Sequence, residues 1–160
     1  MAPPTLTNVA LRDVIENLTN LQSLSLHECR AITDAALPLL ARSTTLTSLD
    51  LRDCSITESG LRIISFGTMQ LQSLRCSCST ASDSLFKQLA TSFPMLTELE
   101  SNSVYCTDAT LTALSQCAQL RRLTMRYARF SNAAVCDLVE ACNQLICLRV
   151  DNVAITGIYI

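Results

Sequence analysis

A short pattern of apolar residues, which we call the frame, recurs along the chain at an almost constant spacing. Its first leucine is Leu21, and the frame returns at positions 46, 71, 96, 120 and 145, so that successive units are 25, 25, 25, 24 and 25 residues long. A period held this closely is the signature of a repeat protein, whose units are too small to bury their apolar sides alone. The units must therefore stack, and we expect the chain to act by presenting an extended surface.

Each unit combines a strand pattern with a helix pattern. The first, fourth and sixth places of the frame are mostly apolar, and the fourth and sixth alternate like the buried face of a strand. A Ser or Thr follows a few residues later, usually with an acidic or amide neighbour, which suits a helix N-cap and the positive end of the helix dipole. Apolar residues three apart then predict a short amphipathic helix in each unit: Leu37 and Leu40, Leu61 and Ile64, Phe86 and Leu89, Leu111 and Leu114, and Val135 and Leu138.

Stacked strand–turn–helix units predict an α/β fold. We expect a right-handed solenoid of about six repeats, with a parallel sheet on the concave side and helices on the convex side. Residues 1–160 form a single domain in this interpretation. Residues 1–20 supply the helix of a partial repeat, residues 21–144 five full repeats, and residues 145–160 a truncated last repeat.

Two cysteines narrow the type of repeat. Cys29 and Cys54 occupy the ninth place of the frame, within the strings HECRAITDAAL and RDCSITESGL. The chain resembles leucine-rich repeat proteins of the cysteine-containing subfamily, found in F-box substrate receptors of ubiquitin ligases and in related protist proteins. The resemblance implies a protein-recognition scaffold or adaptor, including substrate recognition for a ubiquitin ligase. No F-box is expected here, because the residues before Leu21 already match the cap and helix of a repeat.

Composition and charge restrict the partners and the compartment. The net charge of −2 argues against a general nucleic-acid binder, which would carry a basic excess. No apolar run approaches the roughly 20 residues that span a membrane, and the N-terminus lacks the basic flank of a signal peptide. We expect a cytoplasmic or nuclear protein in a reducing compartment, with neither nucleic acid nor membrane as a partner.

The nine cysteines fit reduced thiols better than disulfides or metal ligands. Their number is odd, and they are spread regularly along the frame. The Cys76–Cys78 pair has no second pair or histidine cluster at zinc-ligand spacing, so no metal and no cofactor are expected. The frame places five cysteines inward (Cys29, Cys54, Cys76, Cys117 and Cys142) and leaves four as the more reactive thiols (Cys78, Cys106, Cys136 and Cys147).

Catalytic machinery is not expected in this chain. His27 is its one histidine, and no phosphate-binding loop or nucleophile motif is present. His27 and Cys29 could form a nucleophilic pair, but the frame points the histidine out of the sheet and the thiol into the core.

The third, fifth and seventh places of each unit should face away from the helices. In the later units they collect charged side chains, beside a tyrosine. Arginine and tyrosine are enriched at interface hot spots, so the expected partner-binding residues are Arg75, Glu98, Glu100, Arg122, Arg126, Tyr127 and Arg149. The alternative is that Arg75 pairs with Glu100 and Glu98 with Arg122 across neighbouring strands, where exposed pairs contribute about 0 to 1 kcal/mol each.

Three functional classes remain open. The first is a protein-protein interaction scaffold or adaptor that binds a protein partner through the concave sheet. The second is a structural cytoskeletal or flagellar component that assembles through its open ends; the apolar C-terminal end, which lacks a capping unit, should then make the largest contact in self-association. The third is an enzyme that uses an exposed thiol.

Overall fold

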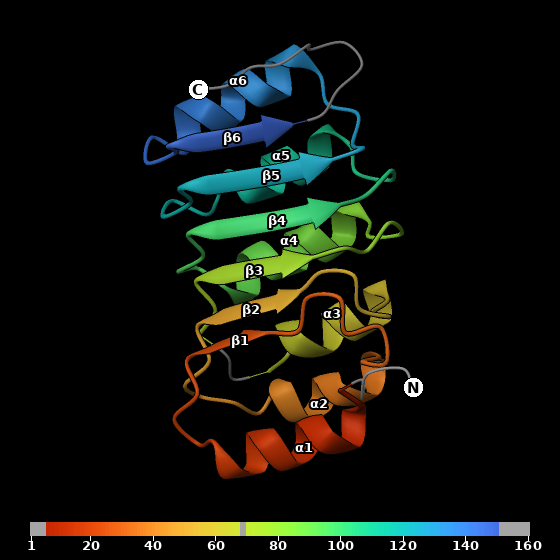
Figure 1. The fold of residues 1–160 in the computed structure, drawn as a ribbon. Coiled ribbons are helices and arrows are strands. Elements are labelled where there is room, and N and C mark those ends of the chain that lie inside the picture. The colour runs from red at the N-terminus through yellow and green to blue at the C-terminus, as the bar shows by residue number, and fades with distance from the viewer. Residues whose placement is uncertain (1–5, 68–69, 151–160) are drawn as a thin grey trace.

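Helices and strands alternate along the chain (Figure 1). The computed structural model describes residues 6–67 and 70–150. The strands are β1 (Ser23–Ser25), β2 (Ser48–Leu51), β3 (Ser73–Cys76), β4 (Glu98–Asn102), β5 (Arg122–Arg126) and β6 (Cys147–Val150). The helices are α1 (Asn8–Asn17), the 3-10 turn η1 (Asp34–Ala36) that leads into α2 (Leu37–Leu40), α3 (Glu58–Ser65), α4 (Asp83–Ser92), α5 (Asp108–Leu114) and α6 (Asn132–Ala141).

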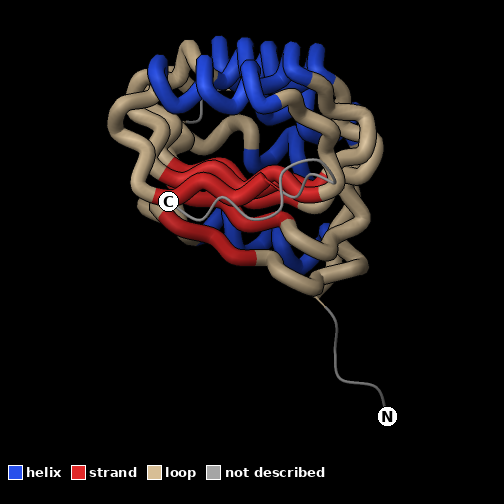
Figure 2. The backbone as a smooth tube through the Cα atoms, turned by 90° about the horizontal axis from the view of Figure 1, so that it is seen from above, coloured by secondary structure: helices blue, strands red, loops and turns tan. Residues whose placement is uncertain are grey.

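The strands form one parallel sheet in chain order. Each strand pairs in parallel with the next, and the third place of every unit stands in one row across the sheet: Ser23, Ser48, Ser73, Glu98, Arg122 and Cys147. The helices cover one face of the sheet and leave the other open (Figures 1 and 2). The row of helices extends further than the row of strands, so the open face lies on the inside of the curve. The expected α/β repeat solenoid is confirmed.

One continuous core lies between the two layers. The inward leucines of the strands and the predicted helix pairs, such as Leu61 with Ile64, are buried in a single cluster. Burial is incomplete in the first unit, where Leu21 and Leu24 are half-buried, whereas Leu46 and Leu49 at the same places are 1% and 0% exposed. The first strand therefore leaves part of its apolar side uncovered at the N-terminal end.

The sheet keeps its register although the helices differ in length. The 24-residue unit that starts at Leu96 contains α5, which has seven residues; α3 has eight, α4 and α6 have ten each, and α2 has four. Glu98 nevertheless stands opposite Arg122, and Leu99 opposite Leu123. Variation in the helical layer thus leaves the strand register unchanged.

A side-chain clamp joins the helix start of each unit to the next unit. The carboxylate of Asp83 accepts three hydrogen bonds. Two come from Thr107, from its backbone N–H at 2.8 Å and its hydroxyl at 2.7 Å, and the third comes from the hydroxyl of Thr110 at 2.6 Å. Asp34 accepts in the same way from the N–H and hydroxyl of Thr57. Equivalent contacts join Asn8 to Thr33, Glu58 to Ser82, and Asp108 to Ser131. From the sequence, an acidic residue at a helix start is expected only to interact favourably with the dipole of its own helix. The structure shows that it also contacts the helix start of the next unit.

Candidate binding surface

The open face of the sheet carries the side chains at the third, fifth and seventh places of each unit. Strand alternation turns the fourth and sixth places into the core, which leaves these three on the other side. The described members are Ser23, Ser25, His27, Ser48, Asp50, Arg52, Ser73, Arg75, Ser77, Glu98, Glu100, Asn102, Arg122, Thr124, Arg126, Cys147 and Arg149. Asp151, expected at the seventh place of the last unit, lies outside the described residues.

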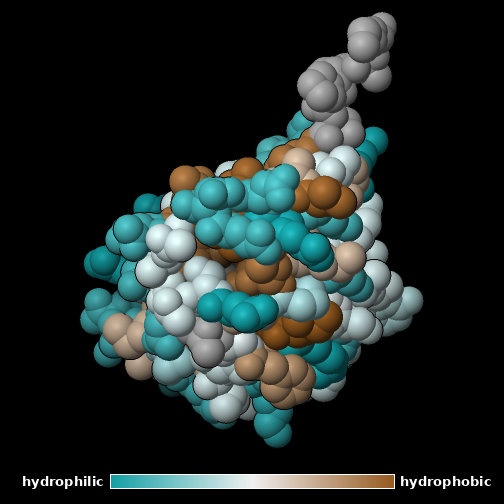
Figure 3. Space-filling model, turned by 90° about the horizontal axis from the view of Figure 1, so that it is seen from below, coloured by the Kyte–Doolittle hydropathy of each residue, from teal (hydrophilic) through white to brown (hydrophobic). Residues whose placement is uncertain are grey.

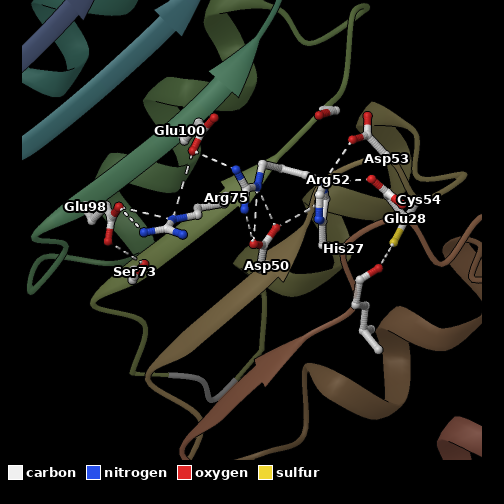
Figure 4. A network of polar contacts seen from close by, with 12 residues as sticks. His27, Glu28, Asp50, Arg52, Asp53, Cys54, Ser73, Arg75, Glu98 and Glu100 are labelled. Carbon is white, nitrogen blue, oxygen red and sulfur yellow. Dashed lines mark hydrogen bonds and ion pairs between the residues drawn. The ribbon is translucent and has the colours of Figure 1, made fainter.

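A network of ion pairs crosses β2, β3 and β4 (Figure 4). Arg52 donates from Nη2 to Asp50 Oδ2 at 2.6 Å and from Nη1 to Glu100 Oε2 at 3.4 Å. Arg75 donates from Nη2 to Glu98 Oε1 at 2.6 Å, while its Nε lies 4.0 Å from Glu100 Oε2. We name this set, Asp50, Arg52, Arg75, Glu98 and Glu100, the paired cluster. Its three carboxylates and two guanidinium groups satisfy one another.

The electrostatics of Asp50 show how tightly the cluster is held. Burial alone would raise the pKa of its carboxyl, but the hydrogen bonds from the Arg52 side chain and backbone N–H, with the nearby positive charge, lower that pKa below its usual value of 3.8. The hydrogen bond to Asp50 raises the pKa of Arg52 in turn, against the effect of burial. Both groups therefore stay charged at neutral pH, and the cluster ties three strands together.

The expected charge pairs are only partly found. Arg75 stands opposite Glu100 and Glu98 opposite Arg122 in the strand register, as the frame predicts. The shortest contact of Arg75, however, runs diagonally to Glu98, because Arg52 reaches across β3 to Glu100. Since Glu98 is already engaged by Arg75 and by the Ser73 hydroxyl at 3.1 Å, Arg122 has no ion pair with it.

The next two strands, β5 and β6, carry arginines and contain no Asp or Glu. Arg122 and Arg149 are exposed and Arg126 is half-buried. No hydrogen bond or ion pair joins the side chain of Arg122 or Arg126 to another described residue, whereas Arg149 does have an interaction partner. We name Arg122, Arg126 and Arg149 the arginine strip. It borders the paired cluster along β4.

Two enclosed polar atoms lie at the seventh places of β4 and β5. The Nε of Arg126 and the Oδ1 of Asn102 are both shielded from solvent and have no hydrogen-bond partner, although these residues stand opposite each other in the register. A buried donor or acceptor without a partner costs about 1 to 3 kcal/mol. The sheet therefore has an unmet polar requirement beside Arg126.

Exposed apolar and aromatic side chains follow the ends of β4 and β5. Val104, Tyr105 and Tyr127 are 53%, 63% and 62% exposed, and we name them the tyrosine edge. Tyr127 has a φ of 64°, in the left-handed region that bulky residues rarely adopt. Glu28 and Asp53 share this conformation at the same place of their units. The turn thus projects the eighth residue of these units away from the core.

His27 belongs to the polar surface. Its Nε2 lies 3.1 Å from Asp53 Oδ2 and 3.9 Å from Glu28 Oε1, and its side chain is 41% exposed. Cys29 is half-buried and packs against the core. The histidine thus points out and the thiol points in, as the frame predicts.

The expected accessibility of Cys106 and Cys78 is wrong. Cys106 is 1% exposed because it directly precedes the N-cap Thr107, a place filled in the other units by the buried residues Ile32, Ile56, Ala81 and Phe130. Because the residue before the N-cap is apolar in these other units, the sequence alone could have predicted that the Cys106 thiol is buried.

Cys78 is 3% exposed for a different reason. In the third and fourth units the eighth residue, Cys78 or Ser103, turns inward, and the ninth residue, Ser79 or Val104, is exposed instead. The inward place therefore shifts by one residue relative to Cys29 and Cys54. Of the four cysteines expected to be more reactive, Cys136 is exposed and Cys147 half-buried.

Burial makes the core thiols poor nucleophiles. It raises the pKa of Cys76 to about 12 and that of Cys117 to about 11. Within residues 6–67 and 70–150, no three His, Cys, Asp or Glu side chains are grouped so that they could hold a metal ion. No helix in the same ranges combines the length and apolar character needed to cross a membrane.

A family model described as Leucine Rich repeat matches residues 42–65. The match runs from the residues after α2 through β2 to the end of α3, which is about one structural unit. No curated protein matches the chain. The matched unit carries the same frame as its neighbours in the sheet.

Proposed function

We propose that this leucine-rich repeat solenoid recognises a protein partner through the open face, with the arginine strip as its principal contact. Solenoids of stacked repeats use extended concave surfaces for binding. The observation that carries the proposal is the contrast across the face: the paired cluster satisfies its own charges, while Arg122 and Arg126 have no partner among the described residues. The resemblance to F-box receptors favours substrate recognition for a ubiquitin ligase within this class.

Charge reversal on the strip tests the proposal. Affinity purification from the native cell should recover a stable partner with the wild-type protein and lose it with Arg122→Glu/Arg126→Glu. Arg30→Glu/Lys87→Glu is the matched control, because both cations are exposed and neither belongs to the arginine strip nor lines the pocket between α1 and α2. Recovery of ubiquitin-ligase subunits with the wild type would support the receptor role. Equal recovery of the same partners by wild type and strip variant would refute the proposal.

A second candidate, end-to-end assembly as a structural component, is favoured by the N-terminal end. A pocket of about 250 Å³ opens between α1 and α2, lined among others by Ile15, Leu18 and Leu39. Leu18 is 52% exposed and Val9 73% exposed. Figure 3 views this end and shows hydrophobic residues at the surface among polar ones. The expected self-association through the C-terminal tail falls on residues outside the described part of the chain.

Sedimentation velocity over a range of protein concentrations separates the two candidates. Assembly through the N-terminal end predicts larger particles at high concentration that disappear in Val9→Glu/Leu18→Glu and persist in Arg122→Glu/Arg126→Glu. A particle whose size does not change with concentration in any of the three proteins would refute the structural candidate.

A further inference from the structure

We propose that the segment docked on the arginine strip is an acidic, extended peptide of the partner, with an apolar or aromatic side chain seated on the tyrosine edge. This inference rests on the proposed function and adds the chemistry of the partner. It follows from the charge distribution, from the guanidinium of Arg126, which pairs with no described residue, and from the exposed aromatic side chains beside it.

The strip is locally basic on a chain that is acidic overall. The net charge is −2, yet residues 121–150 contain Arg121, Arg122, Arg126, Arg129 and Arg149. The carboxylates of that range, Asp137 and Glu140, belong to α6, which is part of the helical layer behind the sheet. An acidic ligand on the open face therefore meets arginines without competing acids from the described parts of β5 and β6.

The paired cluster limits where such a ligand can bind. It presents three carboxylates against two guanidinium groups, and both arginines are already engaged. An acidic segment placed over β2 to β4 would meet net negative charge, and juxtaposed like charges are unfavourable. The same segment moved onto β5 and β6 meets the exposed Arg122 and the half-buried Arg126. The boundary along β4 thus selects the C-terminal half of the face.

The guanidinium of Arg126 gives a reason for binding at the seventh place. Its Nε is enclosed, but the residue as a whole is half-buried, and no described residue pairs with its guanidinium. A carboxylate at the guanidinium of Arg126 supplies a charge-assisted contact, which is stronger than one between neutral groups. Binding there offsets part of the cost of holding this cation half-buried in the free protein.

The tyrosine edge supplies the apolar half of the site. Tyr127 directly follows Arg126, and Val104 and Tyr105 follow the end of the neighbouring strand β4, so all three lie at the margin of the sheet next to the strip. Tyrosines more than 60% exposed offer a rigid amphipathic contact area of the kind that dominates interface hot spots. The partner should therefore combine acidic residues with an aromatic or branched aliphatic one.

Selection of peptides from a random library tests this chemistry while the natural partner is still unidentified. Phage-displayed random peptides of about twelve residues, long enough to span a strand of about five to six residues with flanks, would be panned on wild type, Arg122→Glu/Arg126→Glu and Arg30→Glu/Lys87→Glu. We expect acidic peptides with an aromatic or aliphatic residue from the wild type and the Arg30/Lys87 control, and loss of the acidic bias in the strip variant. Because Arg126 is half-buried, Arg122→Glu alone is included as a variant at an exposed position.

Binding measurements then quantify the contact. Fluorescence anisotropy with the most enriched peptide should show affinity reduced about tenfold or more in the double reversal, and about threefold or more in Arg122→Glu. Tyr127→Ser should weaken binding without changing the salt dependence, whereas added salt should weaken the wild-type complex.

Three results would overturn the inference: enrichment of peptides with no acidic bias, no enrichment at all, or a single-stranded oligonucleotide bound as tightly as the peptide with the same dependence on Arg122. Failure of the proposed function gives a different result. If a native partner is lost with the strip variant but the selected peptides are not acidic, recognition through the open face stands and the partner chemistry is wrong. If the native partner is insensitive to the strip, the proposed function itself fails.

Discussion

Asp83→Ala should be one of the most damaging substitutions of a polar residue in this protein. Its carboxylate accepts three bonds from the next unit, at 2.8 Å and 2.7 Å from Thr107 and at 2.6 Å from Thr110. Thr110 is 0% exposed, so its hydroxyl would lose its acceptor at a cost of about 1 to 3 kcal/mol. The two groups of Thr107 are exposed and can bond to water, which reduces their loss to about 0.5 kcal/mol each. We expect the free energy of unfolding to fall by about 3 kcal/mol.

Asp108→Ala is the matched control for this experiment. Asp108 occupies the same place one unit later but accepts from the backbone N–H of Ser131, a single exposed contact at 2.7 Å. Its removal should cost about 1 kcal/mol or less. Urea unfolding of both variants, followed by circular dichroism, gives the comparison. If Asp83→Ala destabilises the protein no more than Asp108→Ala, the clamp does not hold the units together as argued.

The same clamp predicts a pH dependence. Burial raises the pKa of Asp83, but hydrogen bonds from Thr107 and Thr110 outweigh it and lower the pKa below its usual value of 3.8. A carboxyl whose pKa is lower in the folded state stabilises the protein fully above its unfolded pKa and loses that contribution as the pH falls through the folded pKa. The stability difference between wild type and Asp83→Asn should therefore be constant above about pH 5 and shrink below about pH 4.

Three further predictions concern packing, thiols and the strip. A Cβ at Gly60 would collide with Asp34 Oδ1 and lie 2.7 Å from Leu37 Cδ1, so Gly60→Ala should destabilise the protein by about 1 to 3 kcal/mol in thermal unfolding; an unchanged melting temperature would contradict this contact. Under native conditions iodoacetamide should label the exposed Cys136 first and Cys147 more slowly, and peptide mass spectrometry should find Cys76, Cys78, Cys106, Cys117 and Cys142 labelled only after unfolding. Arg126→Met removes an enclosed donor that has no acceptor, so urea unfolding should show stability unchanged or raised by up to about 1 kcal/mol; a clear loss of stability would mean that the guanidinium has a structural role.

The frame predicts the layers well because burial is periodic in the sequence. Leucines at the first, fourth and sixth places and Thr or Ser at the caps are local signals, and they locate strands and helices in nearly every unit. Ser101 shows that the place matters more than the residue type, since it is 0% exposed at a sixth place and accepts a contact from Cys76 Sγ at 3.6 Å. A polar residue in this row could be assigned to the core from the frame alone.

Turn conformation and side-chain reach could not be predicted in the same way. The inward shift at Cys78 and Ser103 depends on backbone dihedral angles between strand and helix, for which the frame carries no signal. The contact from Arg52 to Glu100 crosses the intervening strand β3, because an arginine side chain is long enough to span it on the open face. Pairing rules based on directly opposed residues therefore find the neighbours of Arg75 but miss its shortest contact.

Because the register of the sheet is constant, changes of length in the helical layer are separate from substitutions on the open face. The unit that starts at Leu96 is one residue shorter than its neighbours, yet the rows of the open face stay aligned. Insertions and deletions behind the sheet can thus accumulate without moving Arg122 relative to Glu98. Conversely, residues at the third, fifth and seventh places can change without repacking the core. Outside the paired cluster, which ties β2, β3 and β4 together, the helical layer and the open face can therefore diverge independently.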